Sequence, residues 1–306
     1  MRMTGATPAL LLPTPGVPGR GKDMNSVAVP SFFGAVLGAL DTLTDQLPAG
    51  TTDADVTTHL ERNRKAYGWL WQNGVVAPDY STPAARVGYV FAYVPAHAAF
   101  MKHGLDTCPS YIPTQSPSGS LSVTSIGGGP GSDLLGFFAH LIERGHRFDA
   151  ISCVQADREP GWTEVVNAVV AEHIVYLPAW VNHKHVDFAH SATFQPQAGL
   201  FSTDIILGSY LLSELVRNRA ATDAFFHAMG AQATPGTLFI VLDNNADALV
   251  PHYDAMMEIA GFSKQTSFCE DLRIDEGRDV LDGYATRYNS NTKINGRIYF
   301  GIYRKD

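Results

Sequence analysis

The chain has 306 residues, of which 45% are hydrophobic and 17% charged, enough for one large domain with an appended segment. Its net charge of −8 and its 22 scattered basic residues argue against a protein that grips nucleic acid mainly through phosphates. No apolar run approaches the roughly 20 residues that a membrane helix needs, so a membrane protein is not expected.

Residues 1–28 contain a short leucine run broken by prolines. This pattern fails as a signal peptide and predicts a disordered tail. Cys108, Cys153 and Cys269 are far apart in the sequence and lack the spacing of metal ligands. We therefore expect reduced, buried thiols in a cytoplasmic protein.

Residues 29–115 form the next predicted segment, which has helical patterns throughout. Ser31 is a suitable cap for a helix whose apolar residues recur at helical spacing over 32–43. A second helix is predicted over 53–72, with Gly74 as its stop.

A third helix is predicted from Pro83 towards residue 103, with Thr82 as its cap and Gly104 as its stop. Pro95 lies inside this pattern and should kink or break the helix. The segment is rich in aromatic residues, which are Tyr67, Trp69, Trp71, Tyr80, Tyr89, Phe91, Tyr93 and Phe100.

The apolar run 121–126 leads straight into the glycine-rich stretch 127–131, and an amphipathic helical pattern follows. This order predicts a strand, a tight turn and a helix. Glycine lets the backbone adopt positive φ and approach a ligand closely, while free N–H groups and the helix dipole point at it. The dinucleotide motif G-x-G-x-x-G does not fit, and no G-K-[ST] follows, which excludes a P-loop. A structural turn without a ligand is the alternative.

The spacing Gly127-x-Gly129-x-Gly131 resembles the first motif of class I S-adenosylmethionine (SAM)-dependent methyltransferases. The resemblance implies that this turn passes under the amino-acid end of SAM. That family usually has Asp or Glu two residues before the first glycine, whereas this chain has Ser125, so the SAM ammonium needs another partner. The candidate cofactor-binding residues are Ser125, Gly127, Gly128, Gly129, Gly131, Asp133, Asp157, Asp187 and Ser209.

Asp157 follows a strand-like run over residues 148–154. A carboxylate at the end of the second strand offers two acceptors to the two hydroxyls of a ribose. In the resembled family this position binds the SAM ribose. Glu159 is the second choice for that role, and a surface turn residue is the structural alternative.

The remaining pattern alternates strands and helices, which predicts a parallel sheet covered on both faces. A closing pair of strands matches the antiparallel seventh strand of the resembled fold. We therefore predict an α/β fold over 116–306, a seven-stranded Rossmann-like sheet with helices on both faces, preceded by an N-terminal helical lid. The expected elements are helix 162–171, strand 174–177, strand 201–207, helix 211–230, strand 237–243, helix 246–260 and strands 262–268 and 297–303.

The resemblance implies that the N-terminal helices cover SAM and the methyl acceptor. An aromatic lid suits a flat acceptor and a sulfonium cation, although these rings are also expected to form core. His97, Tyr93 and Tyr89 share a helix face and are the candidate bases. Candidate substrate-binding residues are Tyr67, Trp71, Tyr210, Glu214 and Asn244.

His183, His185 and His190 suggest a metal site at first sight. Magnesium prefers oxygen ligands, and zinc would need a fourth ligand and a tighter motif. We expect no metal and interpret these residues as loop histidines after the third strand. Asp187 in the same loop could accept a hydrogen bond from the adenine amine.

The leading hypothesis is a SAM-dependent methyltransferase acting on a small aromatic molecule. No N-P-P-[YF] motif for amine methylation and no proline-cysteine nucleophile for cytosine methylation follows the fourth predicted strand. The composition resembles that of high-GC actinobacterial proteins, and the chain is similar to the actinobacterial indole methyltransferases. C3 of an indole in a tryptophan-containing cyclic dipeptide is therefore the expected acceptor atom. The alternatives are an RNA uridine-N3 methyltransferase and a catalytically silent SAM-fold binding subunit, and a homodimer is left open.

Overall fold

The computed structural model describes residues 31–68, 78–113, 115–197, 199–215, 219–245, 249–274 and 276–306. Its N-terminal helices are α1 (Phe32–Asp45), α2 (Asp53–Gly68) and α3 (Pro83–Thr107), followed by the 3₁₀ helix η2 (Pro109–Tyr111). Both predicted caps are confirmed, because the Ser31 hydroxyl accepts from the Gly34 N–H and the Thr82 hydroxyl accepts from the Ala85 N–H. The predicted end of the second helix, with Trp71 and Gly74, lies outside the described residues.

Pro95 was predicted to kink or break the helix, and a break is wrong, because α3 continues through Pro95 and beyond the predicted stop at Gly104 to Thr107. Proline has no N–H, so a helix normally loses the hydrogen bond to the carbonyl four residues earlier. Here that carbonyl belongs to Phe91, and the hydroxyl of Thr292 donates to it. The next carbonyl, of Ala92, accepts from the Lys293 N–H at 2.8 Å. A distant segment of the chain therefore satisfies the backbone that the proline leaves open.

The sheet has seven strands in the order β3-β2-β1-β4-β5-β7-β6. Only β7 runs antiparallel to its neighbours, as predicted. The chain leaves β1 towards β2 on one side and returns to β4 on the other, and ligands of such sheets bind where this order reverses. The strands are β1 (Ser120–Ile126), β2 (Ala150–Asp157), β3 (Ala179–His185), β4 (Ile205–Ser209), β5 (Leu238–Asn244), β6 (Phe262–Arg273) and β7 (Asn295–Lys305).

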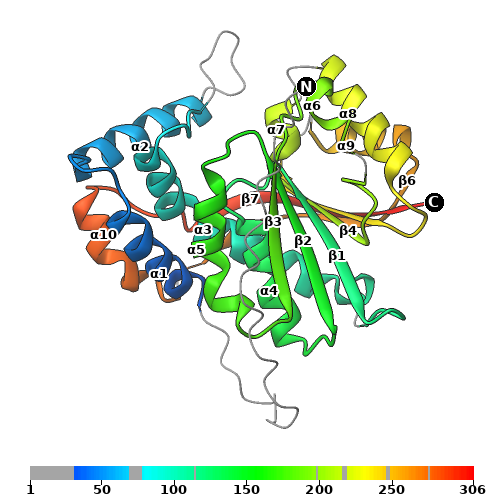
Figure 1. Cartoon of the computed structure of the whole chain (residues 1–306), viewed down its shortest axis with the longest axis horizontal. Helices are drawn as coiled ribbons and strands as arrows, with labels where there is room; N and C mark the ends of the chain where they lie inside the picture. Colours follow the sequence, from blue (N-terminus) through cyan, green and yellow to red (C-terminus); the bar gives the residue numbers. More distant parts are fainter. Residues whose placement is uncertain are drawn as a thin grey trace, which may run out of the picture.

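Helices cover both faces of the sheet, as Figure 1 shows. The helices that follow β1 are α4 (Ser132–Glu143), α5 (Trp162–Ile174), α6 (Ser191–Phe194), α7 (Leu211–Leu215), α8 (Arg219–Gln232), α9 (Leu249–Ile259) and α10 (Asp282–Arg287), with the 3₁₀ helix η3 (Arg278–Leu281) before α10. Alternate residues of β4 point to opposite cores. Ile205 and Leu207 join a core with α1 to α5, whereas Ile206 joins a core with α6 to α9.

Strand β3 corrects a predicted boundary. The run 174–177 was expected to be a strand, but it closes α5 and the following turn, and the strand is formed by 179–185. Those residues include His183 and His185, so these histidines lie on a strand and not in a loop. Because β3 is at the edge of the sheet, its residues are partly exposed, and Trp180 is 47% exposed. An edge strand lacks the continuous apolar run of a buried one.

Other predicted boundaries differ from the structure by a few residues. Strand β2 reaches Asp157, β4 includes Gly208 and Ser209, and α8 passes the predicted stop at Gly230 to end at Gln232. The backbone of Gly261 has φ +70, as expected for a glycine at a helix end. All three cysteines are free, but Cys269 on the edge strand β6 is exposed, which corrects the expectation of three buried thiols.

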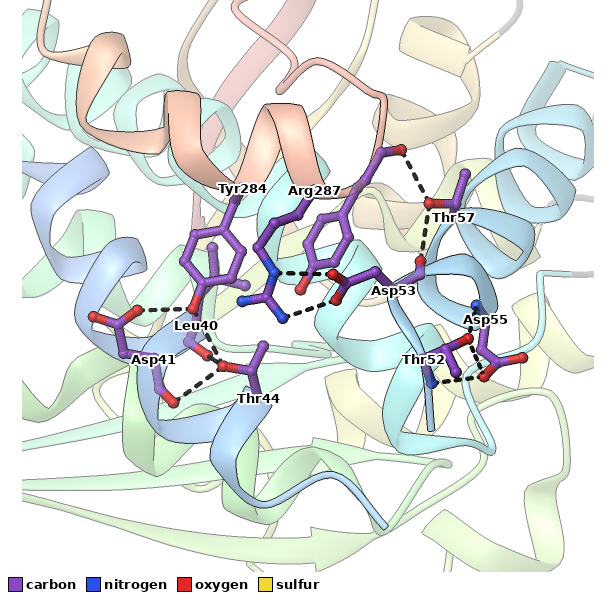
Figure 2. A network of polar contacts seen from close by, with 10 residues as sticks. Leu40, Asp41, Thr44, Thr52, Asp53, Asp55, Thr57, Tyr284 and Arg287 are labelled. Carbon is purple, nitrogen blue, oxygen red and sulfur yellow. Dashed lines mark hydrogen bonds and ion pairs between the residues drawn. The ribbon is translucent and has the colours of Figure 1, made fainter. Parts of the chain in front are cut away.

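The connection between β6 and β7 folds back against the N-terminal helices, a contact that the sequence did not predict. Figure 2 shows Tyr284 and Arg287 of α10 reaching towards Asp41 of α1 and Asp53 of α2. Tyr284 donates to Asp41 at 2.7 Å, and Arg287 binds Asp53 through two nitrogens at 3.2 and 2.8 Å. The hydroxyl of Thr57 donates to the Tyr288 carbonyl at 3.0 Å. These bonds attach the N-terminal helices to the C-terminal part of the sheet domain.

Candidate active site

The glycine turn after β1 owes its shape to left-handed backbone at alternate residues. Gly127, Gly129 and Gly131 have φ values of +59, +49 and +79. Residues with a Cβ rarely adopt this region, which explains the G-x-G-x-G spacing. Gly128 is required for space, because a Cβ there would lie 2.0 Å from the Oγ of Ser125. The turn delivers the chain into α4 with its backbone close to the surface of a pocket.

Two side chains of β2 form hydrogen bonds to the backbone of the glycine turn. The amide of Gln155 donates to the Gly129 carbonyl at 2.7 Å, and the Asp157 carboxylate accepts from the Gly129 N–H at 2.9 Å. The other oxygen of Asp157 accepts from the Glu159 N–H at 2.9 Å. Each carboxylate oxygen has two lone pairs, so Asp157 keeps acceptor capacity for a ligand. Burial raises the pKa of this carboxyl above its ordinary value.

Ser125 and Asp133 form a buried pair behind the turn and do not line the pocket. The Ser125 hydroxyl donates to Asp133 at 2.7 Å, and the Leu134 N–H donates to the other carboxylate oxygen at 2.8 Å. Burial raises the pKa of Asp133 to about 6 despite these bonds, and the charge of Asp157 adds to the increase. Position 125 therefore has a hydroxyl that binds the carboxylate of Asp133, eight residues further along the chain, on the buried side of the turn.

A pocket opens at the carboxyl ends of β1, β2 and β4, where the topology predicts a ligand. The sequence-predicted residues that line it are Tyr67, Tyr89, His97, Gly127, Gly128, Gly129, Asp157, Asp187, Ser209, Tyr210 and Glu214. The predicted residues that do not line it are Tyr93, Ser125, Gly131, Asp133 and Asn244. Trp71 lies outside the described residues.

Aromatic rings form one wall of the pocket. The ring centroids of Tyr80 and Tyr89 are 5.2 Å apart, and Trp162 lies 5.2 Å from Tyr80 and 5.7 Å from Tyr89. The hydroxyls of Tyr67 and Tyr80 are hydrogen-bonded to each other. Burial raises the pKa of Tyr67, Tyr80 and Tyr89 above the ordinary value, and the pKa of Tyr93 rises for the same reason. These phenols therefore stay protonated at neutral pH and act as hydrogen-bond donors.

His97 faces the pocket from α3, and Lys293 contacts it from behind. The Nζ of Lys293 is 3.4 Å from Nε2 of His97, and the rings of His97 and Tyr210 stack with centroids 4.1 Å apart. Burial and the Lys293 charge keep the pKa of His97 well below its ordinary value. Burial also lowers the pKa of Lys293 to about 8. A neutral His97 that accepts from Lys293 through Nε2 carries its own proton on Nδ1.

Two polar atoms in the pocket wall have no hydrogen-bond partner in the described part of the chain. They are the Oγ of Ser209 and the hydroxyl of Tyr210, both buried from solvent. Unpartnered buried hydroxyls are rare in native proteins, because each costs free energy when it loses water without a replacement. A ligand in the pocket could supply the missing partners.

The histidines near β3 do not assemble a metal site in the described residues. His183 contacts Gln155 at 3.1 Å, and His190 contacts the carboxylate of Asp187 at 2.8 Å. The other oxygen of Asp187 accepts from the Ala189 N–H at 2.9 Å. Asp187 therefore enters the pocket wall with both oxygens already engaged.

The candidate site residues did not include several residues of the pocket, among them Arg158, Trp162 and Tyr80, the last of which was named only as a lid aromatic. They also did not include Gln155 and Lys293, which lie behind the wall. Gln155 is a buried polar residue in an apolar strand, which was a usable signal. Lys293 had no such signal in the sequence, because it reaches α3 from a connection almost 200 residues later.

In the described part of the chain, no helix has the length and hydropathy needed to cross a bilayer.

No protein-family model matches the sequence, and no curated protein matches it either. Solved structures with a similar arrangement include precorrin-6y C5,15-methyltransferase from Geobacter metallireducens, 12% identical with a TM-score of 0.41 over 66% of this chain and 87% of that chain. A TehB-like SAM-dependent methyltransferase from Corynebacterium glutamicum is 10% identical, with a TM-score of 0.42 over 81% of this chain and 99% of that chain. At these values the similarity assigns no function to this chain.

Proposed function

We propose that the protein is a SAM-dependent methyltransferase. The observation that carries this proposal is the left-handed glycine turn joined by hydrogen bonds to the carboxylate of Asp157 at the mouth of one pocket. Backbone N–H groups of the turn suit a carboxylate, and the free lone pairs of Asp157 suit a ribose diol. The spacing of the turn fits no dinucleotide or P-loop motif.

The residues present fit SAM in three further respects. Tyrosine and tryptophan faces line the pocket, and such faces attract a cation such as a sulfonium. The hydroxyls of Ser209 and Tyr210, which have no partner among the described residues, offer hydrogen bonds to a bound molecule. When bound, SAM supplies a methyl group that its sulfonium has already activated. The chain then has to align the acceptor, exclude water and receive a proton.

The acceptor that we propose is a small aromatic molecule, with indole C3 of a tryptophan-containing cyclic dipeptide as the leading candidate. Flat aromatic rings pack well against the wall formed by Tyr80, Tyr89 and Trp162. Attack by indole C3 would leave an iminium that an internal nitrogen traps, with loss of one proton. The net charge of −8 disfavours the alternative RNA-base substrate.

A catalytically silent binding subunit is the second candidate, because Ser125 stands where the family has an acidic residue. The buried bond between Ser125 and Asp133 shows how this chain uses that position, and it places no carboxylate in the pocket. Turnover decides between the two candidates.

The test is transfer of a labelled methyl group from SAM to a panel of cyclic dipeptides, free indoles and phenols. We expect methylated product from a tryptophan-containing member, and less product from the Asp157→Ala variant at SAM concentrations that just saturate the wild type. Tight SAM binding without transfer to any acceptor would favour the silent subunit. Transfer to uridine in RNA alone would favour the RNA-base alternative.

A further inference from the structure

Glu214 is a carboxylate in the pocket wall that has no part in the SAM binding proposed above. It belongs to the short helix α7 directly after β4, and its side chain is open to solvent within the pocket. It makes no hydrogen bond or ion pair with any residue in the described part of the chain. As far as the described residues are concerned, both of its oxygens are therefore available to a ligand.

The backbone that carries Glu214 is fixed by a buried network. The Ser213 N–H donates to the Asp243 carboxylate at 3.1 Å, and the hydroxyl of Tyr253 donates to the same oxygen at 2.6 Å. The Leu212 N–H donates to Tyr253 at 3.3 Å. These bonds join the first turn of α7 to β5 and α9, so the position of Glu214 relative to the sheet is set by rigid elements.

The residue before α7 is held in a conformation that it rarely adopts. Tyr210 has φ +56, although it is not a glycine. Its N–H donates to the Leu242 carbonyl at 2.7 Å, and its carbonyl accepts from the Ser213 hydroxyl at 2.7 Å. Strained backbone of this kind persists where the surroundings enforce it and is frequent at functional sites. It turns the chain so that Ser209, Tyr210 and Glu214 all line one pocket.

The other proton-accepting groups of the pocket are less suited to removing a proton. The tyrosines keep their protons at neutral pH because burial raises their pKa. His97 is neutral, but its Nε2 lies against the ammonium of Lys293, so the remaining ring nitrogen bears the proton. Asp157 accepts from two backbone N–H groups and its remaining lone pairs are assigned to the ribose, while the oxygens of Asp187 bind the Ala189 N–H and His190. Among the carboxylates that line the pocket, Glu214 is the one that makes no hydrogen bond or ion pair with another described residue.

In the described part of the chain, charged and titratable groups of several elements face Glu214. They are Asp157 and Arg158 at the end of β2, Asp243 of β5, Tyr67 of α2, Tyr80 before α3 and Tyr89 of α3. Although the side chain is open to solvent, the pocket walls around the carboxyl raise its pKa to about 7, against the charge of Arg158 and with help from the charges of Asp157 and Asp243. A base with a pKa near the working pH is the most effective one.

We propose that Glu214 is the catalytic base that accepts the proton of the methyl acceptor, an inference that rests on the proposed function. The acceptor forms a bond to the transferred methyl carbon, while the bond from that carbon to sulfur breaks and leaves its electrons on sulfur. The acceptor thereby becomes cationic and loses its N–H or O–H proton to a Glu214 oxygen. The neutral carboxylic acid afterwards releases this proton to water, since the side chain is open to solvent.

The test compares wild type, Glu214→Gln, Glu214→Asp and the control Glu172→Gln, which removes an exposed carboxylate on α5. The acceptor is a tryptophan-containing cyclic dipeptide. We expect Glu214→Gln to lower kcat at least 100-fold, within the range for general bases. Its affinity for SAM should stay within threefold of wild type, which also shows that the variant is folded. Glu214→Asp should retain part of the activity, and Glu172→Gln all of it.

The pH dependence gives a signature that a structural role would not produce. In the wild type kcat/KM should fall on acidification with a midpoint near the pKa of about 7, because the carboxylate must be ionised and kcat/KM reports the free enzyme. This acid limb should be absent from Glu214→Gln. A kcat within threefold of wild type in Glu214→Gln, with the acid limb unchanged, would overturn the inference.

A readout without an acceptor separates this inference from the proposed function. Protein labelled with ¹³C at glutamate carboxyls is titrated with S-adenosylhomocysteine bound, and the Glu214 signal is identified by its loss in Glu214→Gln. A midpoint near 7 supports the inference even if no tested acceptor is methylated, whereas a midpoint below 5 contradicts it. Absence of SAM binding in the wild type would instead overturn the proposed function, and with it the role of Glu214.

Discussion

Replacing Asp157 by alanine should weaken SAM binding while the protein stays folded. The substitution removes the predicted acceptor of the ribose hydroxyls. It also removes the partner of the Gly129 N–H at 2.9 Å, so the turn loses one of its two side-chain bonds to β2. The Glu159 N–H loses its acceptor as well.

The size of the effect follows from the charge of the lost acceptor. A hydrogen bond to a charged group contributes about 1.5 to 3 kcal/mol, and a loss of about 2 kcal/mol corresponds to a roughly 30-fold higher Kd. Because burial raises the pKa of Asp157, wild-type SAM affinity should begin to fall at a higher pH than for an ordinary aspartate. The Asp157→Ala variant should lack this part of the pH dependence.

Isothermal titration with SAM measures both effects, and circular dichroism confirms that the variant is folded. Asp149→Ala is a suitable control, because this acidic residue lies outside the pocket, beside Gly119 at the other end of β1. It should bind SAM as the wild type does. An Asp157→Ala protein that is folded and binds SAM within threefold of wild type would refute the ribose assignment.

Three further changes test the site and its surroundings. Gly129→Val places a β-branched residue at φ +49 and should abolish SAM binding with the circular dichroism spectrum retained; a wild-type isotherm would show that the turn does not bind the ligand. Lys293→Met should raise the pKa of His97 towards its ordinary value, because a neighbouring positive charge is lost, and a histidine titration by NMR that is unchanged would contradict the contact. His173 is fully buried, and burial lowers its pKa from 6.5 to about 4. The native state therefore loses up to ~3 kcal/mol of stability as the pH falls from 6.5 to 4, because the unfolded chain binds a proton first, and it loses none above pH 6.5. Urea unfolding of His173→Phe should show a smaller decrease between pH 7.5 and 4.5 than wild type, and equal decreases would sink this explanation.

The parts of the fold that the sequence predicted well depend on local signals. The caps at Ser31 and Thr82 and the turn at 127–131 are each specified within a few residues. Asp157 was found because strand ends of a parallel sheet meet at one edge, and β1 and β2 are indeed neighbours there.

The parts that it missed depend on distant partners. Helix α3 passes through Pro95 because Thr292 donates to the carbonyl that the proline leaves free, a contact across about 200 residues. The predicted position of strand β3 was wrong because an edge strand alternates exposed and partly buried residues, and its polar histidines resembled a loop. The sequence predicted Glu214 as a substrate-binding residue. Its suitability as a base follows only from the contacts that occupy the other proton-accepting groups of the pocket, such as His97 with Lys293.

The most direct test of the central claim is isothermal titration of the purified protein with SAM and, separately, with NAD. The turn spacing and Asp157 predict micromolar binding of SAM and no detectable binding of NAD. Binding of NAD instead, or of neither molecule by a folded protein, would contradict the account of this pocket as a SAM site.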